Sequence, residues 1–342
     1  MSDSLRVGAV VFAIKRGLGY LAKSFHDHGL ITDVTYIRHG SIHTEEDWYP
    51  DGHCSGASSR NLVNDESVRA MIRNVDWMLF FETPFDWHMI DYARSVGTKT
   101  ALMTMYECTP ATLPFIPDLF LCPSLLDLNY FPEESSVFIP IPVDTARTPW
   151  KLRERAEVYV HNGGYLGLQG REGTTNVIEA MAYVQSPLKL IVRCQKSVGS
   201  AHERICREDS RIEYSCGVAQ HGSLYAEGDV AVGAQIWHGC SLPLQEAYAS
   251  GLCVMNTNRF PMNTWLPNDP LIPVAKTVKG SAARGFMSID VSHVSPQAIA
   301  AKMDEFYCED ITSLSESGRE WAEANTWEQL LPVYRQTLED RR

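Results

Sequence analysis

The sequence predicts an α/β protein made of two doubly wound, Rossmann-like domains that face each other across a cleft. The chain has 342 residues, of which 44% are hydrophobic, so it is long enough for two domains with separate cores. Short apolar segments alternate with amphipathic helical segments in both halves, a pattern typical of parallel sheets covered by helices. A proline-rich segment without helical periodicity, FIPIPVDTARTPW (138–150), separates the two series and is expected to link the domains.

The first half begins with the apolar run VGAVVFAI (7–14), which we expect to form a buried strand. The run is too short to span a bilayer, and it lacks the basic lead and the small-residue cleavage site of a signal peptide. We therefore expect a protein of the cytoplasm, or of the host cytoplasm if it is viral, with no integral membrane segment. The later segments of this half predict a helix at 19–29, strands at 33–40 and 75–81, a helix at 86–97, and strands at 99–107 and 118–124.

A long segment, GSIHTEEDWYPDGHCSGASSRN (40–61), follows the second strand and has little periodicity. Loops of this length in compact domains are usually functional or disordered. The segment is therefore a candidate acceptor-binding loop, and a mobile surface loop is the alternative.

The alternation restarts after the linker. It predicts strands at 157–164, 188–194, 211–217, 229–235 and 253–258, and helices at 174–184, 242–250 and 325–339. Pro332 should kink the last helix. We expect domains at 1–150 and 151–325, followed by a C-terminal helix at 326–342 that packs back towards the first domain.

The segment HGCSLPLQEAYASG (238–251) combines a helix with an unusual start. Ser241 suits the N-cap, Leu242 and Pro243 suit the first turn, and Gly251 suits a left-handed residue after the last turn.

Gly239, Cys240 and Ser241 lead into this helix. Its start should present free amides and the positive end of the helix dipole to a phosphate. Glu246 lies one turn inside, where its carboxylate could accept hydrogen bonds from a ribose diol. The segment thus indicates a site for a nucleoside diphosphate.

The segment HGCSLPLQEAYASGLCV resembles the signature of family four of the retaining glycosyltransferases, the glycogen-synthase-like enzymes of the GT-B fold. Four further segments are similar to family motifs in the same order: KRGLGYLA, IPIPVDTARTPW, HNGGYLGLQGREGTTNVIEAM and TWEQLLPVY. The resemblance implies an N-terminal acceptor domain and a C-terminal donor domain for a nucleotide sugar, such as a UDP-sugar. It also implies transfer to a hydroxyl with retention, no catalytic metal and no further cofactor.

The resemblance assigns Glu246 to the donor ribose. His238 stands where the family has the glutamate that holds hydroxyls of the transferred sugar, which implies a different donor sugar or a different grip on it. The alternative is a histidine that bonds to backbone at the start of the helix.

Glu172 stands where the family usually has a lysine that neutralises the diphosphate. A carboxylate ~4 Å from a phosphate would cost about 4 kcal/mol at an effective dielectric constant near 20, so Glu172 must point away or be paired. Arg171, Arg193 and Lys196 are the cations expected to bind the diphosphate, and a solvated basic patch is the alternative. Gly164, in the glycine-rich start of the second domain, is a further expected donor-binding residue.

In the first domain, Gly17 and Gly19 precede a predicted helix and are expected to let the backbone approach the donor, although a simple tight turn is the alternative. Glu82, Thr83, Tyr106 and Glu107 follow buried strands, where ligands bind in open α/β sheets. We expect Glu82, Glu107 and Tyr106 to be the catalytic candidates, with a carboxylate as the base for the acceptor. Capping or ion-paired carboxylates are the alternative. The histidine that family members often keep near this position is absent.

The net charge of −12 argues against broad, nonspecific binding to nucleic acid or anionic lipid, although it does not forbid a local basic groove. The sequence has no Asp-x-Asp motif and no zinc-like Cys/His spacing, so we expect no metal site. The nine cysteines are expected to be reduced thiols. The acceptor and the oligomeric state are not predicted.

Three other functions stay open. One is a phage-type DNA glycosyltransferase that acts on hydroxymethylated bases, against which the acidic charge counts. The second is a sugar-nucleotide-binding protein without transferase activity. The third is a two-domain sugar-nucleotide epimerase.

Overall fold

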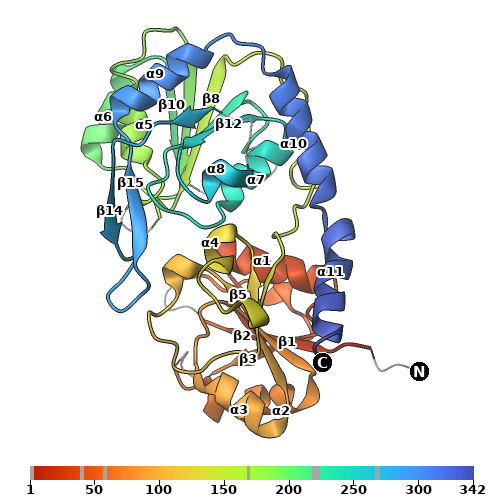
Figure 1. Ribbon diagram of the computed structural model, residues 1–342. Coiled ribbons are helices and arrows are strands. Elements are labelled where there is room, and N and C mark those ends of the chain that lie inside the picture. The colour runs from red at the N-terminus through yellow and green to blue at the C-terminus, as the bar shows by residue number, and fades with distance from the viewer. Residues whose placement is uncertain (1–3, 39–41, 57–59, 168–169, 218–223, 266–269) are drawn as a thin grey trace. The chain divides into compact units, whose positions relative to one another are not determined.

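The computed structural model describes residues 4–38, 42–56, 60–167, 170–217, 224–265 and 270–342. The chain forms two compact units, each built around one sheet (Figure 1). The first unit comprises Met1–Pro142, Gly285–Met287 and Trp327–Arg342, and the second comprises Val143–Arg284 and Ser288–Thr326. The division after Pro142 lies inside the proline-rich segment, earlier than the sequence suggests.

The first unit has a seven-stranded parallel sheet in the order β3-β2-β1-β4-β5-β6-β7. Its strands read as continuous apolar runs because helices cover both faces of the sheet. The strands are β1 (Val7–Phe12), β2 (Asp33–Ile37), β3 (His53–Ser55), β4 (Trp77–Glu82), β5 (Lys99–Thr104), β6 (Leu119–Cys122) and β7 (Ser136–Phe138).

Strand β3 lies inside the long segment for which the sequence predicted only a loop. It pairs in parallel with β2, Thr35 lying opposite His53. Three residues are too few to show an alternating pattern, so only the pairing with β2 defines this edge strand.

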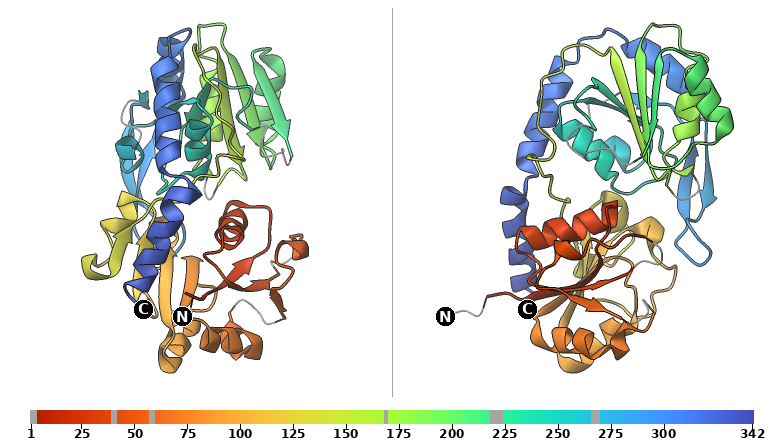
Figure 2. Two further views of the ribbon diagram at one scale, coloured as in Figure 1. Left: turned by 90° about the vertical axis from the view of Figure 1, so that its right-hand side faces the viewer. Right: turned by 180° about the vertical axis from the view of Figure 1, so that it is seen from behind.

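The helices of the first unit lie on both sides of its sheet (Figure 2). Phe25 of α1 packs edge-on against Trp327 and Tyr334 of α11, with ring centroids 4.8 and 5.1 Å away, so the C-terminal helix belongs to this unit. Helix α11 continues through Pro332. The helices are α1 (Gly17–Asp27), α2 (Glu66–Asn74), α3 (His88–Val96), α4 (Leu125–Leu128) and α11 (Trp327–Glu339).

The second unit has a parallel sheet in the order β10-β9-β8-β11-β12-β13 and an antiparallel hairpin, β14–β15, that the sequence did not predict. The strands are β8 (Val158–Gly164), β9 (Lys189–Cys194), β10 (Ile212–Cys216), β11 (Val230–Gly233), β12 (Cys253–Thr257), β13 (Leu271–Ile272), β14 (Lys276–Gly280) and β15 (Ile289–His293). The helices are α5 (Thr174–Ala180), α6 (Ser200–Glu208), α7 (Leu242–Ala249), α8 (Met262–Trp265), α9 (Pro296–Phe306) and α10 (Thr312–Ala324).

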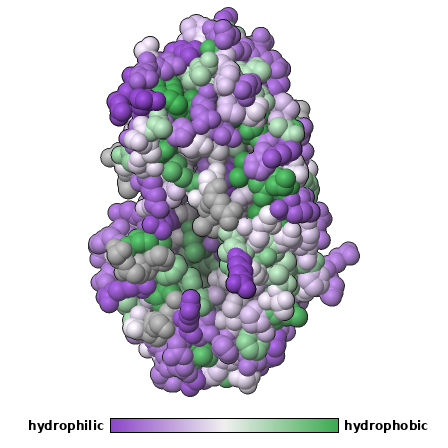
Figure 3. All heavy atoms as spheres, turned by 90° about the vertical axis from the view of Figure 1, so that its left-hand side faces the viewer, coloured by the Kyte–Doolittle hydropathy of each residue, from purple (hydrophilic) through white to green (hydrophobic). Residues whose placement is uncertain are grey.

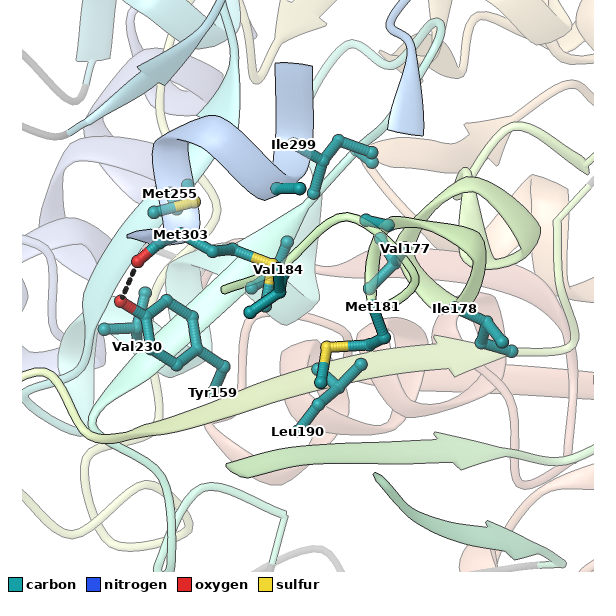
Figure 4. Close-up of a cluster of buried hydrophobic side chains, with 14 of the residues drawn as sticks. Tyr159, Val177, Ile178, Met181, Val184, Leu190, Val230, Met255, Ile299 and Met303 are labelled. Atoms are coloured by element: carbon teal, nitrogen blue, oxygen red, sulfur yellow. Dashed lines mark hydrogen bonds between the residues drawn. The ribbon is translucent and has the colours of Figure 1, made fainter. Parts of the chain in front are cut away.

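Each unit buries its apolar side chains between its sheet and its helices. On the face drawn in Figure 3, hydrophilic side chains cover most of the surface and hydrophobic ones form small patches. In the second unit, side chains of α5 and α9 pack onto the strands, and the hydroxyl of Tyr159 donates to the carbonyl of Met303 at 3.0 Å (Figure 4). This core covers one face of the sheet, and helices α7 and α10 pack on the other face.

Both sheets reverse their winding direction in the middle. The first sheet does so between β1 and β4, and the second between β8 and β11. The loops that leave neighbouring strands diverge at such a point, and ligands of open α/β sheets bind there, beyond the carboxyl ends of the strands.

In the second unit, two loops meet at the switch point. The amide of Ile236 donates to the carbonyl of Arg171 at 2.9 Å. Gly173, whose φ is +69°, approaches the Ala234 carbonyl so closely that a Cβ atom there would lie 2.1 Å from the oxygen. Glycine is therefore required for both its backbone conformation and its lack of a side chain.

We expect Gly173→Ala to lower the free energy of unfolding by about 3 kcal/mol, because it adds a clash to the strain of a left-handed alanine. Gly170→Ala is the matched control, since φ there is +68° and no atom of the residues that the structure describes lies within 4 Å of the added Cβ atom. The control should cost about 1 kcal/mol. Urea unfolding measures both values, and equal costs would contradict the close approach of the two loops.

Candidate functional site

The candidate site lies at the carboxyl edge of the second sheet. Three parts of the chain form it: the residues from Arg171 to Gly173, the loop after β11 from Ala234 to Ser241, and the start of helix α7. The close packing of the two loops places their polar side chains beside the helix.

Helix α7 begins at Leu242 with Ser241 at the N-cap position, as the sequence predicted, but the Ser241 side chain does not cap the helix. Ser241 has φ 45° and ψ 68°, and its side chain makes no capping hydrogen bond. Instead its hydroxyl accepts a hydrogen bond from Nε2 of Gln235 at 2.8 Å. A left-handed serine is strained, and such strain is often found at functional sites. At the other end, Gly251 has φ +88°, so the predicted left-handed glycine is confirmed.

Most amides at the start of α7 are already hydrogen-bonded, which corrects the expectation of a row of free donors. The amides of Leu244 and Gln245 donate to the Ser241 carbonyl at 3.0 and 3.2 Å. The Ser241 amide donates to Nδ1 of His238 at 3.1 Å, and Pro243 has no N–H group. The amide of Leu242 has no acceptor among the residues that the structure describes.

His238 lies at the start of the helix with 6% of its surface exposed. Because its Nδ1 accepts from Ser241, the proton resides on Nε2, which lies 3.4 Å from Oε1 of Glu172. His238 therefore bonds to the backbone at the start of the helix, as the alternative interpretation of this residue expected. Its imidazole also faces the carboxylate of Glu172.

Glu172 is paired, as its position in place of a cation required. Nε of Arg171 lies 3.3 Å from its Oε1, and the Arg171 guanidinium also lies 5.0 Å above the ring of Trp237. Burial alone would raise the pKa of the Glu172 carboxyl, but His238 and Arg171 together lower it to about 2. The carboxylate is therefore ionised at neutral pH, and the adjacent Arg171 guanidinium balances its negative charge.

Arg259 is a site residue that the sequence analysis missed. It follows β12 at the same edge of the sheet, it is 6% exposed, and its Nη1 donates to the carbonyl of His238 at 2.8 Å. Its position after a buried strand was the only signal in the sequence.

Glu246 lies one turn into α7 and accepts a hydrogen bond from the hydroxyl of Tyr225 at 2.8 Å, through Oε2. Burial raises the pKa of Tyr225 well above its ordinary value, and the Glu246 carboxylate raises it further. The phenol therefore keeps its proton and fixes one carboxylate oxygen. Tyr225 belongs to no motif, so nothing in the sequence indicated it.

The other expected donor-binding residues of this unit lie along the same edge. Nη1 of Arg193 donates to the Leu224 carbonyl at 3.0 Å, and its Nη2 forms an ion pair with Glu227. Lys196 is exposed, with Nζ 5.3 Å from the ring centre of Tyr165. Gly164 ends β8 with φ +48°, a conformation that favours glycine.

Gly17 and Gly19 lie in the first turn of α1 and do not precede it, which corrects the predicted start of this helix. A Cβ atom on Gly19 would lie 2.1 Å from the Ile14 carbonyl, whereas Gly17 has open space around it. Gly19 therefore serves the tight turn between β1 and α1.

The catalytic candidates of the first unit differ in exposure. Glu82 ends β4 with φ 58° and is partly exposed, and the hydroxyl of Thr83 donates to the Cys108 carbonyl. Tyr106 and Glu107 follow β5, but only 4% and 1% of their surfaces are exposed. Burial makes these two poor candidates for contact with an acceptor.

Asp127 is a buried neighbour that the sequence analysis did not select. Its Oδ1 accepts the Tyr106 amide at 2.7 Å, and its Oδ2 accepts the Ser124 hydroxyl. Burial and the nearby Glu107 raise the pKa of Asp127 to about 7. Asp127 therefore holds a proton at mildly acidic pH.

No group of three or more His, Cys, Asp or Glu residues in the described part of the chain could hold a metal ion. Among the same residues, no helix has both the length and the apolar character needed to cross a membrane.

No protein-family model and no curated protein matches the sequence. Solved structures do resemble the fold. A glycosyltransferase from Rickettsia africae matches with a TM-score of 0.70 at 14% identity, over 99% of this chain and 98% of that one. HepE of Anabaena in complex with UDP and glucose matches with 0.66 at 11%, over 98% and 100%. Sucrose-phosphate synthase from Thermosynechococcus elongatus matches with 0.61 at 13%, over 98% and 100%. The predicted fold class, two parallel-sheet α/β domains of the GT-B type, is confirmed.

Replacing Glu172 with Gln should lower the free energy of unfolding at pH 7 by about 3 kcal/mol, because a carboxyl whose pKa is lowered stabilises the folded state when ionised. The stabilisation is complete above the ordinary pKa of 4.5 and is lost as the pH falls towards 2. In urea titrations, the difference between the two proteins should shrink to about half or less near pH 3.

The control is Glu208→Gln, because Glu208 is exposed on α6 and should leave stability nearly unchanged. A difference between wild type and Glu172→Gln that stays constant down to about pH 3 would show that His238 and Arg171 do not hold the carboxylate ionised.

Proposed function

We propose that this protein is a glycosyltransferase that transfers a sugar from a UDP-sugar to an acceptor hydroxyl. The observation that carries the proposal is the hydrogen bond between Tyr225 and Glu246. Glu246 lies one turn into α7, at the switch point of the second sheet. Support also comes from the shared fold, since HepE was solved with UDP and glucose.

Glu246 would bind the ribose of the donor. A ribose diol offers two hydroxyl donors, and an ionised carboxylate is an acceptor at both oxygens. Tyr225 holds the carboxylate through Oε2, so its orientation is set before the donor arrives. Such preorganisation lowers the entropy cost of binding.

The diphosphate would rely on cations more than on helix amides, because the Leu242 amide is the one donor of the first turn without an acceptor among the described residues. Arg193 lies near the end of β9 and Lys196 follows that strand, so both would approach the phosphates at this edge, while Arg171 neutralises Glu172. Cations and helix-end amides can stabilise a leaving diphosphate without a metal, so we propose metal-independent transfer.

His238 would contact the transferred sugar. Its Nε2 carries a proton and faces Glu172 at 3.4 Å, so a sugar oxygen would have to share or replace this contact in order to accept from Nε2. Retention at the anomeric carbon rests on the family resemblance. Of the catalytic candidates, Glu82 is proposed as the base for the acceptor hydroxyl, because it is partly exposed at a strand end.

Two alternatives share this site. A DNA glycosyltransferase would use the same donor and a hydroxymethylated base as acceptor, and a sugar-nucleotide-binding protein would bind without transfer. Incubation with UDP-sugars separates the readings. Slow release of UDP indicates an enzyme, thermal stabilisation by UDP without release indicates a binding protein, and transfer of label to hydroxymethylated DNA indicates the first alternative.

Glu246→Gln should weaken UDP binding by about tenfold or more, because the ribose loses a charge-assisted hydrogen bond. Isothermal titration calorimetry measures the dissociation constant. Glu208→Gln, on an exposed face of α6, serves as the control and should bind UDP like the unmodified protein. Equal affinity for UDP in the Glu246→Gln variant and the control would remove Glu246 from the ribose site.

A further inference from the structure

We propose that Arg153 is a positioning residue for the nucleotide, acting through the turn at 224–228. This inference rests on the proposed function, because the turn contacts Glu246 and Arg193 of the proposed donor site. Arg153 belongs to none of the motifs that the sequence analysis selected.

The Arg153 guanidinium is buried and is surrounded by backbone carbonyls. Its Nε donates to Gly228 at 2.6 Å, and its Nη2 donates to Tyr225 and Ala226 at 3.1 and 3.3 Å. Its Nη1 donates to Lys151 at 2.7 Å, and only 3% of the residue is exposed. A buried charge is tolerated only when its donors are satisfied, and here one side chain binds three carbonyls of a single turn.

The same turn holds two proposed donor-binding residues. The Tyr225 hydroxyl donates to Glu246, and the Leu224 carbonyl accepts from Arg193, which also pairs with Glu227. Hydrogen bonds weaken steeply when their geometry changes, and binding groups must be held within about 0.5 Å of a productive position. A displacement of this turn would therefore disturb both the binding of the ribose by Glu246 and the position of Arg193.

A lysine at 153 keeps the charge but loses the planar fork that reaches several carbonyls at once. If Arg153 acts through Tyr225 and Glu246, the effects of changing Arg153 and Tyr225 on UDP binding cannot be independent. A purely structural arginine would lower stability without this coupling.

The test is a double-mutant cycle on the dissociation constant for UDP. Arg153→Lys and Tyr225→Phe should each weaken binding by about tenfold, and the double variant should be no weaker than Arg153→Lys within about twofold. Independent effects, giving about a hundredfold loss in the double variant, would overturn the proposal, as would unchanged affinity in Arg153→Lys.

Arg211→Lys is the matched control. The Arg211 guanidinium also donates to backbone carbonyls of the same unit, at Val184, Ser186 and Met181, with distances of 2.9, 3.3 and 2.7 Å. None of these residues belongs to the proposed site. The control should melt at a lower temperature and bind UDP with unchanged affinity.

A second measurement uses the unmodified protein, because Arg153→Lys can fail to fold. UDP should slow amide hydrogen exchange in the peptide that covers the turn at 224–228, and it should not slow exchange around Arg211. Unchanged exchange in the turn would overturn the proposal. Failure of the proposed function is distinguishable, because then the unmodified protein itself does not bind UDP.

Discussion

The contact between Gly173 and the carbonyl of Ala234 is the constraint on which the candidate site depends. A side chain at Gly173 would separate the loops after β8 and β11, and the hydrogen bond from Ile236 to Arg171 joins them. This contact brings Glu172 within reach of His238, although the two residues lie far apart in the sequence. The site is therefore a property of two loops packed together.

Charge balance follows from this packing. The helix dipole stabilises a carboxylate near the start of a helix, but such a carboxylate occupies the region where an anionic ligand would bind. Arg171 neutralises it, His238 faces it with its protonated Nε2, and Arg259 donates to the backbone carbonyl of His238. The charges of Arg171 and Glu172 therefore offset each other locally, and Arg259 adds a second arginine that is bound to the His238 carbonyl.

Buried polar side chains tie the helix to the rest of the second unit. Tyr225 joins Glu246 to the turn before β11, and Arg153 joins that turn to the segment that enters the unit from the linker. In the first unit, Asp127 holds the Tyr106 amide in a comparable way. In each case hydrogen bonds hold a buried polar side chain in one position.

Local periodicity and backbone preference were enough to predict the fold class, most of the strands, some of the helices and the left-handed Gly251. The other features depend on contacts between distant parts of the chain. The side chain of Ser241 accepts a hydrogen bond from Gln235 and does not cap the helix, and β3 exists through pairing with β2. Most of the amides that were predicted to be free at the start of α7 donate to Ser241 or His238. Contacts with partners distant in the chain leave no periodic or motif signal in the sequence. Such contacts hold Tyr225, Arg153 and Arg259 in the second unit and Asp127 in the first.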